Sequence, residues 1–432
     1  MTANLSVILY FLLILLLVVS SSVLLSMWLD MREGFANALD DYKSTSGYKT
    51  AAAAVVALAD SRGNGRRDIT DMLASSVAPP AVEQCLVNFF SLGCRFSGYL
   101  GPFSNGYFDT DVAVTSALKM GCRTFVLEID YMDSCNDYFP RLVVRDVNGR
   151  IRSNEDSSLP TCNTLAQSNI TAVCKTLRVA AFGPAVQNPN DPLIVVLYLL
   201  RLPPRDKTGQ GSTTLLTYLS NVAKCLTPLL DKTVDNIGTG GTFARQQQES
   251  TLLTNNIIDY QGRVLFFCNA DTSPFRTTTA KYSQNEDLDY IVNLRLSYKQ
   301  SQLGCTSNKT GGTPYSLLET AESYMTLPPD QIESMRDETK LRWTICFAAD
   351  PSQPVPQKTY DEITGDIGIH CVPIQIWDTT TTAFMFDDEH FKVWSFIPKP
   401  SELRFRRPPV AVPQEQVPQA NSHGGLLRTP TT

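Results

Sequence analysis

A long apolar run near the start of the sequence constrains this chain more than any other feature. No charged residue lies between Leu5 and Trp28, and the first charge in the chain is Asp30. About 20 apolar residues in a helix cross a hydrocarbon core roughly 30 Å thick. The run therefore predicts a single transmembrane helix at residues 4–28, through which the protein contacts a membrane.

Two alternatives compete with a spanning helix. A cleaved signal peptide normally has an apolar region of about 7–15 residues that follows positive charge. This run is longer and no basic residue precedes it, although the small residues Ala36-Asn37-Ala38 would suit cleavage. A helix packed on a protein core normally shows one polar face, and this run shows none. The spanning helix is therefore the favoured interpretation.

The cysteine content bears on the compartment of the remaining chain. Eleven cysteines are many for a cytosolic protein of this length, and none shows the C-x-x-C spacing of a zinc site. Two glycosylation sequons begin at Asn169 and Asn308. These features favour disulfides and an extracytoplasmic or lumenal location, or one within a virion. The cysteines that are neighbours in sequence are Cys85 and Cys94, Cys122 and Cys135, and Cys162 and Cys174.

Composition divides the chain behind the span into three parts. Residues 29–84 contain the Ala-rich stretch Tyr48–Asp60 and predict a helical neck. Residues 85–407 have globular composition. Residues 408–432 are rich in Pro, Gln and Thr with little apolar bulk, which predicts a disordered tail. The net charge of −6 lacks the basic excess of a nucleic-acid binder, so no nucleic-acid partner is expected.

Apolar runs of strand length alternate with helix-like stretches through residues 85–407. Several runs are continuously apolar, which is typical of parallel strands buried on both faces. Seven or eight such strands with intervening helices predict an α/β fold of the (β/α)8 TIM-barrel type. The strand-like runs are Thr124–Tyr131, Arg141–Arg145, Leu193–Leu200, Arg263–Phe267, Tyr290–Leu296, Arg342–Phe347 and Cys371–Trp377. The helix-like stretches are Asp111–Met120, Leu165–Phe182 and Ser212–Leu230.

Two motifs at opposite ends of this region carry a resemblance to a known family. The first is DTDVAVTSALKMGCRTFVLEIDYMD from Asp109, followed by PRLVVRDVNGR. The second is GIHCVPIQIW from Gly368, followed by FIPKPSELR from Phe396. Together they resemble the helix–strand unit and the last strand with its exit in phosphatidylinositol-specific phospholipases C. The chain also looks like divergent phospholipase-C-like proteins of large DNA viruses that infect protists.

The resemblance implies a catalytic apparatus that this chain has largely lost. Such phospholipases use two histidines as base and acid, and the eukaryotic branch holds a calcium ion with one Asn, one Asp and two Glu. Phe96 and Arg145 stand where the histidines are expected, and Ser97 and Tyr198 replace the Asn and one Glu. Two of the expected calcium ligands are present, Glu128 and Asp130.

The histidine count supports this interpretation whatever the alignment register. The chain has three histidines, His370, His390 and His423, whereas both catalytic histidines belong to the first half of the barrel. Arg145 stays charged at any working pH, so it could bind a phosphate but could not transfer its proton. His370 is expected to be structural.

Glu128 and Asp130 point to the same side of a strand and form a degenerate calcium pair. Calcium normally takes 6–8 oxygen ligands, so two carboxylates predict at best weak calcium binding, and no cofactor is expected. Structural roles for both residues remain an alternative.

Three functions remain open at this stage. The first is a membrane-anchored, catalytically inactive barrel that is structural or binds protein partners in a membrane-associated assembly, with a virion membrane or minor capsid role as a refinement. The second is a divergent metal-dependent phosphodiesterase that acts on phosphoinositide-like headgroups through Glu128, Asp130 and Arg145. The third is a lipid or sugar binder that keeps the headgroup cleft without chemistry. A mouth filled by Phe96 and Tyr198 would count against the second.

Overall fold

The computed structural model describes most of the region between the neck and the tail. The described residues are 16–21, 43–131, 138–150, 152, 168–203, 213–234, 251–297, 315–386 and 391–407. Within these ranges no helix has the length and apolar character needed to cross a membrane. The predicted span at residues 4–28 falls largely outside the described residues, and the predicted tail at 408–432 falls entirely outside them.

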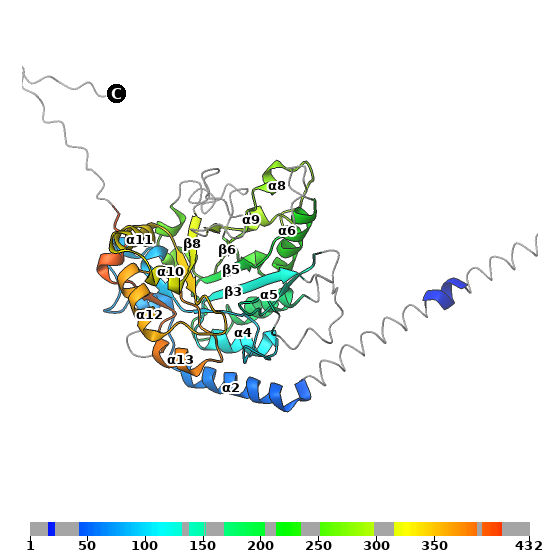
Figure 1. Ribbon diagram of the computed structural model, residues 1–432, viewed down its shortest axis with the longest axis horizontal. Helices are drawn as coiled ribbons and strands as arrows, with labels where there is room; N and C mark the ends of the chain where they lie inside the picture. Colours follow the sequence, from blue (N-terminus) through cyan, green and yellow to red (C-terminus); the bar gives the residue numbers. More distant parts are fainter. Residues whose placement is uncertain are drawn as a thin grey trace, which may run out of the picture.

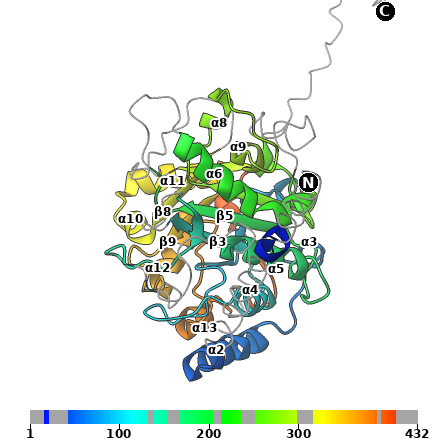
Figure 2. The same cartoon turned by 90° about the vertical axis from the view of Figure 1, so that its right-hand side faces the viewer.

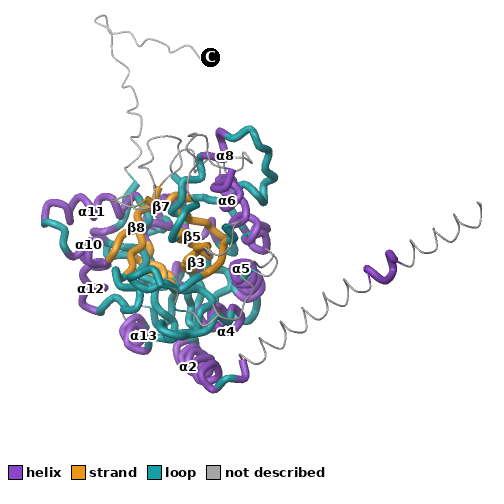
Figure 3. Tube along the Cα trace, turned by 45° about the vertical axis from the view of Figure 1, so that its right-hand side comes forward, coloured by secondary structure: helices purple, strands orange, loops and turns teal. Residues whose placement is uncertain are grey.

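A parallel sheet forms the centre of the domain, as the continuously apolar runs predicted. Its strands follow one another in space as they do in the chain, and helices surround them (Figure 3). All eight residues of the longest strand, Thr124–Tyr131, are buried. The parallel strands in order are β2 (Gly93–Cys94), β3 (Thr124–Tyr131), β5 (Leu193–Leu199), β6 (Val264–Cys268), β7 (Leu294–Ser297), β8 (Tyr315–Thr320) and β9 (Thr344–Phe347).

The sheet does not close into the predicted eight-stranded barrel. The run Cys371–Trp377, expected as the last strand, makes only two isolated parallel bridges, from Cys371 to Ile345 of β9 and from Ile374 to Cys94 of β2. This segment therefore lies between the two ends of the sheet without forming a ladder with either. Pro373 has no backbone N–H to donate, which limits ladder formation there.

The run Arg141–Arg145 also differs from the parallel strand that was expected there. It contributes β4 (Pro140–Leu142), which pairs antiparallel with the end of β3 instead of joining the parallel series. A separate two-stranded ribbon pairs β1 (Phe89–Ser91) with β10 (Phe396–Pro398) and brings the two ends of the domain together.

Helices cover the sheet from outside (Figure 1). The three predicted helix-like stretches are confirmed, the first shifted by one residue and the other two with shorter bounds. The α-helices are α2 (Ser46–Arg62), α3 (Ile69–Leu73), α4 (Thr110–Lys119), α5 (Asn169–Ala180), α6 (Thr213–Cys225), α8 (Pro274–Thr277), α9 (Leu288–Ile291), α10 (Ala321–Met325), α11 (Pro329–Leu341), α12 (Gln357–Glu362) and α13 (Thr379–Met385). Short helical turns are η1 (Ala81–Glu83), η2 (Leu86–Asn88), η5 (Thr227–Lys232), η7 (Leu252–Thr254), η8 (Ile257–Tyr260), η9 (Ile363–Ile367) and η10 (Ser401–Leu403).

The neck helix α2 packs along α4 on the outside of the domain (Figure 2). At one end Asp109, the N-cap of α4, accepts a hydrogen bond from the hydroxyl of Tyr48 at 2.6 Å and lies 3.1 Å from the ammonium of Lys43. At the other end Lys119 pairs with Asp60. The two helices are therefore fixed to each other at both ends.

The cysteines within the described residues are free thiols, while Cys135, Cys162 and Cys305 lie outside those residues. Cys85 and Cys94 are both buried free thiols, as are Cys122 and Cys174. Burial raises the pKa of the Cys85 thiol to about 11 and that of Cys371 to about 12, which keeps both protonated. These cysteines act as small core residues, so the expected disulfides are wrong for this part of the chain.

The inward-facing residues of β3 change character along the strand. Val126 of β3 packs with Ile194 and Val196 of β5 in one apolar cluster. Glu128 and Asp130 follow Val126 at alternate positions, so they share its face but lie nearer the carboxyl end of β3. The interior beside β3 is therefore apolar toward the amino end of the strand and charged at its carboxyl end.

Candidate functional site

The charged end of the sheet interior is the place where barrels of this type carry their active sites. We call it the mouth and define it by Arg95, Phe96, Glu128, Asp130 and Arg145. These residues come from the ends of β2 and β3 and from the chain after β4. Four of these residues, Phe96, Glu128, Asp130 and Arg145, were singled out from the sequence.

Glu128 is tied to an arginine. The Arg95 guanidinium donates from Nε to the carboxylate at 2.6 Å, and the side chains of Arg95 and Glu128 are 8% and 3% exposed. Burial raises the pKa of Glu128, and the positive charge of Arg95 offsets this only in part. Such a buried carboxylate needs its partner, because an unpaired charge is costly away from water.

Arg95 is also held between two aromatic rings. Its guanidinium carbon lies 4.8 Å from the centre of the Phe96 ring and 4.7 Å from that of Phe347. Phe96 in turn stacks on Trp377 and contacts Phe103 edge-on. Desolvated cation–π contacts are among the stronger ones, so the rings hold the guanidinium against Glu128.

Phe96 adopts a backbone conformation that non-glycine residues rarely take. Its φ is +54°, in the left-handed region, and the residue is 2% exposed. Such a conformation costs about 1–3 kcal/mol and persists only where surrounding packing imposes it. The position expected for a catalytic histidine is therefore occupied by a ring locked in the aromatic cluster.

Asp130 is shared by two arginines. Arg145 donates from Nε to one carboxylate oxygen, and Arg201 donates from Nε to both, at 2.9 and 3.1 Å. The Asp130 side chain is fully buried, whereas those of Arg145 and Arg201 are 18% and 35% exposed. Arg145, predicted as a phosphate ligand, thus has an internal carboxylate as its partner.

The other two positions expected to hold calcium carry no carboxylate. Tyr198 lies opposite Glu128 in the pairing of β3 with β5, and its ring centre is 5.3 Å from that of Phe347. The Ser97 hydroxyl lies 3.5 Å from the thiol of Cys94. Tyr198 therefore lies beside Glu128 at the mouth, with its ring against Phe347.

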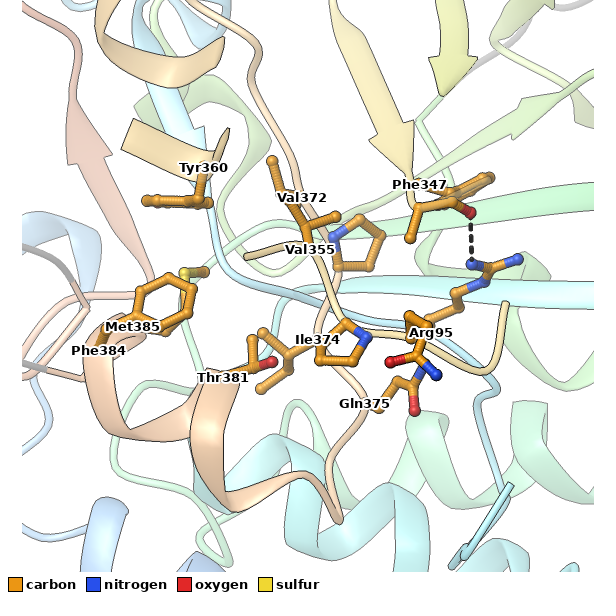
Figure 4. Close-up of a pocket in the computed structure, with 14 residues that line it drawn as sticks. Arg95, Phe347, Val355, Tyr360, Val372, Ile374, Gln375, Thr381, Phe384 and Met385 are labelled. Atoms are coloured by element: carbon orange, nitrogen blue, oxygen red, sulfur yellow. Dashed lines mark hydrogen bonds between the residues drawn. The ribbon is translucent and has the colours of Figure 1, made fainter. Parts of the chain in front are cut away.

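A small hollow adjoins the mouth beside Arg95 (Figure 4). It is bounded mainly by apolar side chains, among them Val355, Ile374 and Phe384. Figure 4 shows the guanidinium of Arg95 turned toward the end of β9, where it donates to the carbonyl of Ala348 at 3.5 Å. The space open to the centre of a water molecule is about 10 Å³, enough for about one water.

The residues at the mouth do not fit a metal ion. Calcium prefers 6–8 oxygen ligands, and both carboxylates already bind guanidinium groups. Across the described ranges, no group of three or more His, Cys, Asp and Glu side chains lies in an arrangement suited to a metal. The degenerate calcium pair of Glu128 and Asp130 is accordingly a pair of ion-pair acceptors in this structure.

His370 lies at the opposite end of the strands, near the start of β9. Its Nδ1 accepts from the backbone N–H of Thr344 at 3.0 Å, and its Nε2 donates to the carbonyl of Val87 at 2.7 Å. Burial lowers the pKa of His370 well below its usual value. Its bonds and its position make it a structural histidine. His390 and His423 lie outside the described residues.

Two members of this charge network escaped the sequence reasoning. Arg95 directly follows β2, and Arg201 lies two residues past the end of β5. A charged residue at the carboxyl end of a parallel strand is itself a signal for the mouth of such a fold.

Comparison with known proteins gives structural similarities only. No protein-family model matches the chain, and no curated protein sequence matches it. Solved structures similar to it include the PLC21 crystal structures of L. pealei and S. officinalis. Their identities are 11% and 13%, with TM-scores of 0.47 and 0.46. They cover 76% and 75% of this chain, which spans only 39% and 38% of theirs.

Two bacterial phospholipases C are also similar. The calcium-dependent phosphoinositol-specific enzyme of Pseudomonas sp. is 12% identical at a TM-score of 0.42, over 70% of this chain and 94% of its own. The calcium-dependent phosphatidylinositol-specific enzyme of Streptomyces antibioticus is 9% identical, with a TM-score of 0.42. That match covers 73% of this chain and 99% of the enzyme. These two enzymes belong to the class that the two sequence motifs resemble.

Proposed function

We propose that this protein is a membrane-anchored, catalytically inactive barrel-like domain with a structural or binding role. The observation that carries the proposal is the occupation of both mouth carboxylates by arginines. Glu128 binds Arg95, and Asp130 binds Arg145 and Arg201. A carboxylate held in this way is not available as a metal ligand or as a base.

Acid–base chemistry also lacks suitable groups at the mouth. Cleavage of a phosphodiester by an internal hydroxyl needs a group that gains and loses a proton near neutral pH. Arginine does not, because its pKa lies above about 12. Among the described residues the histidine is His370, which is buried at the other end of the strands.

The small size of the hollow beside Arg95 favours a structural role over headgroup binding at that point. Within the described residues this hollow has room for about one water, whereas small-molecule sites usually measure about 300–1,000 Å³ in total volume. Phe96, which lies against Arg95, stacks on Trp377.

Anchoring is the second part of the proposal and rests on the predicted span at residues 4–28. The neck helix α2, which follows the span in sequence, is fixed to α4 through Tyr48 and Asp109. A tether attached to α2 would therefore hold the domain firmly. A place in a virion membrane or minor capsid would be one setting for such an anchored domain.

Catalytic inactivity is tested on the full chain in detergent. Phosphatidylinositol and a glycerophosphodiester are offered with calcium or with a chelator, and product is measured against a Glu128→Gln variant. We expect no turnover above that variant under either condition. Turnover that calcium stimulates and Glu128→Gln abolishes would establish the alternative, a divergent metal-dependent phosphodiesterase, and reject the proposal.

Anchoring is tested separately by alkaline extraction of membranes. The full chain is compared with a chain lacking residues 4–28, which retains α2 and its contact with Asp109. The full chain should stay in the membrane pellet and the shortened chain should appear in the supernatant. Release of the full chain by alkali would reject a spanning helix.

A further inference from the structure

The mismatch between the mouth and a metal ion has a specific structural cause. Arg95 places its guanidinium directly on Glu128, with Nε 2.6 Å from Oε1, while Nη1 reaches the carbonyl of Ala348 at 3.5 Å. A cation at this point thus contacts one carboxylate oxygen and one backbone carbonyl oxygen. Those are the ligand types that calcium prefers in proteins.

We infer that the Arg95 guanidinium is the resident cation of the mouth and takes the place of a divalent metal ion on Glu128. The inference deepens the proposed function, since it names the group that keeps Glu128 occupied. It makes the domain independent of metal for folding and excludes calcium from its mouth.

The charges around the mouth explain why a metal cannot compete. The guanidinium of Arg95 lies 2.6 Å from Glu128, and Asp130 already pairs with Arg145 and Arg201. A divalent cation that reached Glu128 without expelling Arg95 would therefore lie at short range from a guanidinium. Like charges at short range in a poorly solvated site repel strongly.

Expelling Arg95 is also unfavourable. The side chain is 8% exposed and lies between the rings of Phe96 and Phe347. Its guanidinium is part of the chain, so it is present at the carboxylate without the entropy cost of recruiting a free ion. A metal would have to remove it from both rings and leave a buried guanidinium without its counter-charge.

The packing of Phe96 adds a further constraint. The residue next to Arg95 is held in a left-handed conformation and stacks on Trp377. The aromatic cluster therefore also fixes the backbone next to Arg95. The same cluster provides a spectroscopic probe, because tryptophan can transfer excitation energy to terbium, a calcium substitute, bound nearby.

The test measures terbium luminescence excited through tryptophan, together with the melting temperature in calcium and in chelator. The wild type is compared with four variants: Arg95→Ala, Glu128→Gln, Arg95→Ala with Glu128→Gln, and Arg95→Lys. Arg178→Ala, which removes an exposed ion pair with Asp231, is the matched control.

The wild type should show no terbium signal that depends on Glu128 and the same melting temperature with and without calcium. Arg95→Ala should bind terbium at least about tenfold more tightly than the wild type does. That gain should vanish in the double variant. Arg95→Lys, which keeps a cation at the position, and Arg178→Ala should behave like the wild type.

Two results would overturn the inference. One is terbium or calcium binding by the wild type that Glu128→Gln removes. The other is a folded Arg95→Ala variant that gains no affinity. If Arg95→Ala does not fold, the Arg95→Lys variant decides. Terbium binding by Arg95→Lys contradicts the inference, and exclusion of terbium by Arg95→Lys supports it. The terbium experiment does not measure hydrolysis, so its result is independent of the turnover test of the proposed function.

Discussion

The Arg95–Glu128 pair offers the sharpest test of the energetics behind the mouth. At 2.6 Å and an effective dielectric constant of about 20, the attraction of two unit charges is about 6 kcal/mol. Desolvation of each buried ion costs several kcal/mol and offsets most of this gain. The pair as a whole should therefore add little net stability, while either partner alone should be strongly destabilising.

A double-mutant cycle separates these two statements. We expect Arg95→Met to lower the free energy of unfolding by about 3–5 kcal/mol, because it leaves the Glu128 carboxylate buried without its partner. Arg95→Met combined with Glu128→Leu should recover most of that loss. In the exposed control pair, Arg178→Met should cost at most about 1 kcal/mol and Asp231→Leu should not rescue it.

Urea denaturation followed by tryptophan fluorescence provides the assay, with each free energy taken from the midpoint and slope of the transition. The reasoning is refuted if Arg95→Met costs no more than Arg178→Met. It is also refuted if the double variant at Arg95 and Glu128 loses the sum of the two single losses, because then the two groups do not interact.

Further predictions concern groups outside the mouth. Tyr48→Phe removes the hydrogen bond to the Asp109 carboxylate and should lower the free energy of unfolding by about 1.5–3 kcal/mol in urea titrations, while Tyr48→Leu should cost more. Burial raises the pKa of Asp191 to about 6, although a nearby guanidinium partly opposes this. The folded state then binds more protons than the unfolded state between pH 3.8 and about 6, so stability should fall by up to about 3 kcal/mol as pH rises through that window, and Asp191→Asn should flatten the slope. At a pH of about 6.5, where an ordinary imidazole is half charged, NMR should find His370 as the neutral tautomer with its proton on Nε2, because burial lowers its pKa, and a cationic ring would contradict the assigned bonds. Gly121→Ala should lower the melting temperature, because φ is +93° at Gly121, and an unchanged melting curve would argue against that conformation.

Much of the sheet was predictable from sequence because its strands are defined locally. Thr124–Tyr131 is continuously apolar except for two acidic residues, and it forms β3 with the predicted bounds. Leu193–Leu200 gives β5 with one residue fewer. Burial on both faces of a parallel sheet selects such runs regardless of their neighbours. Cys371–Trp377 failed as a strand because pairing depends on its partners as well as on its own composition.

The histidine count was also fixed by the sequence alone. A chain without histidine before residue 370 cannot supply one from the first half of a barrel, whatever its fold. Glu128 and Asp130 were also identifiable from the sequence, because the motif that contains them is contiguous. Their interpretation as a calcium pair, however, required knowing what lies opposite them.

The partners of those carboxylates were decided by the tertiary structure. Arg95 is 33 positions from Glu128, and Arg201 is 71 positions from Asp130. These separations span whole helices and strands, so no short-range pattern relates the charges. Register between β3 and its neighbours sets which side chains meet at the mouth, and the aromatic rings then hold Arg95 in place. The sequence alone determined that no histidine precedes residue 370, whereas the fold determined that arginines pair with Glu128 and Asp130.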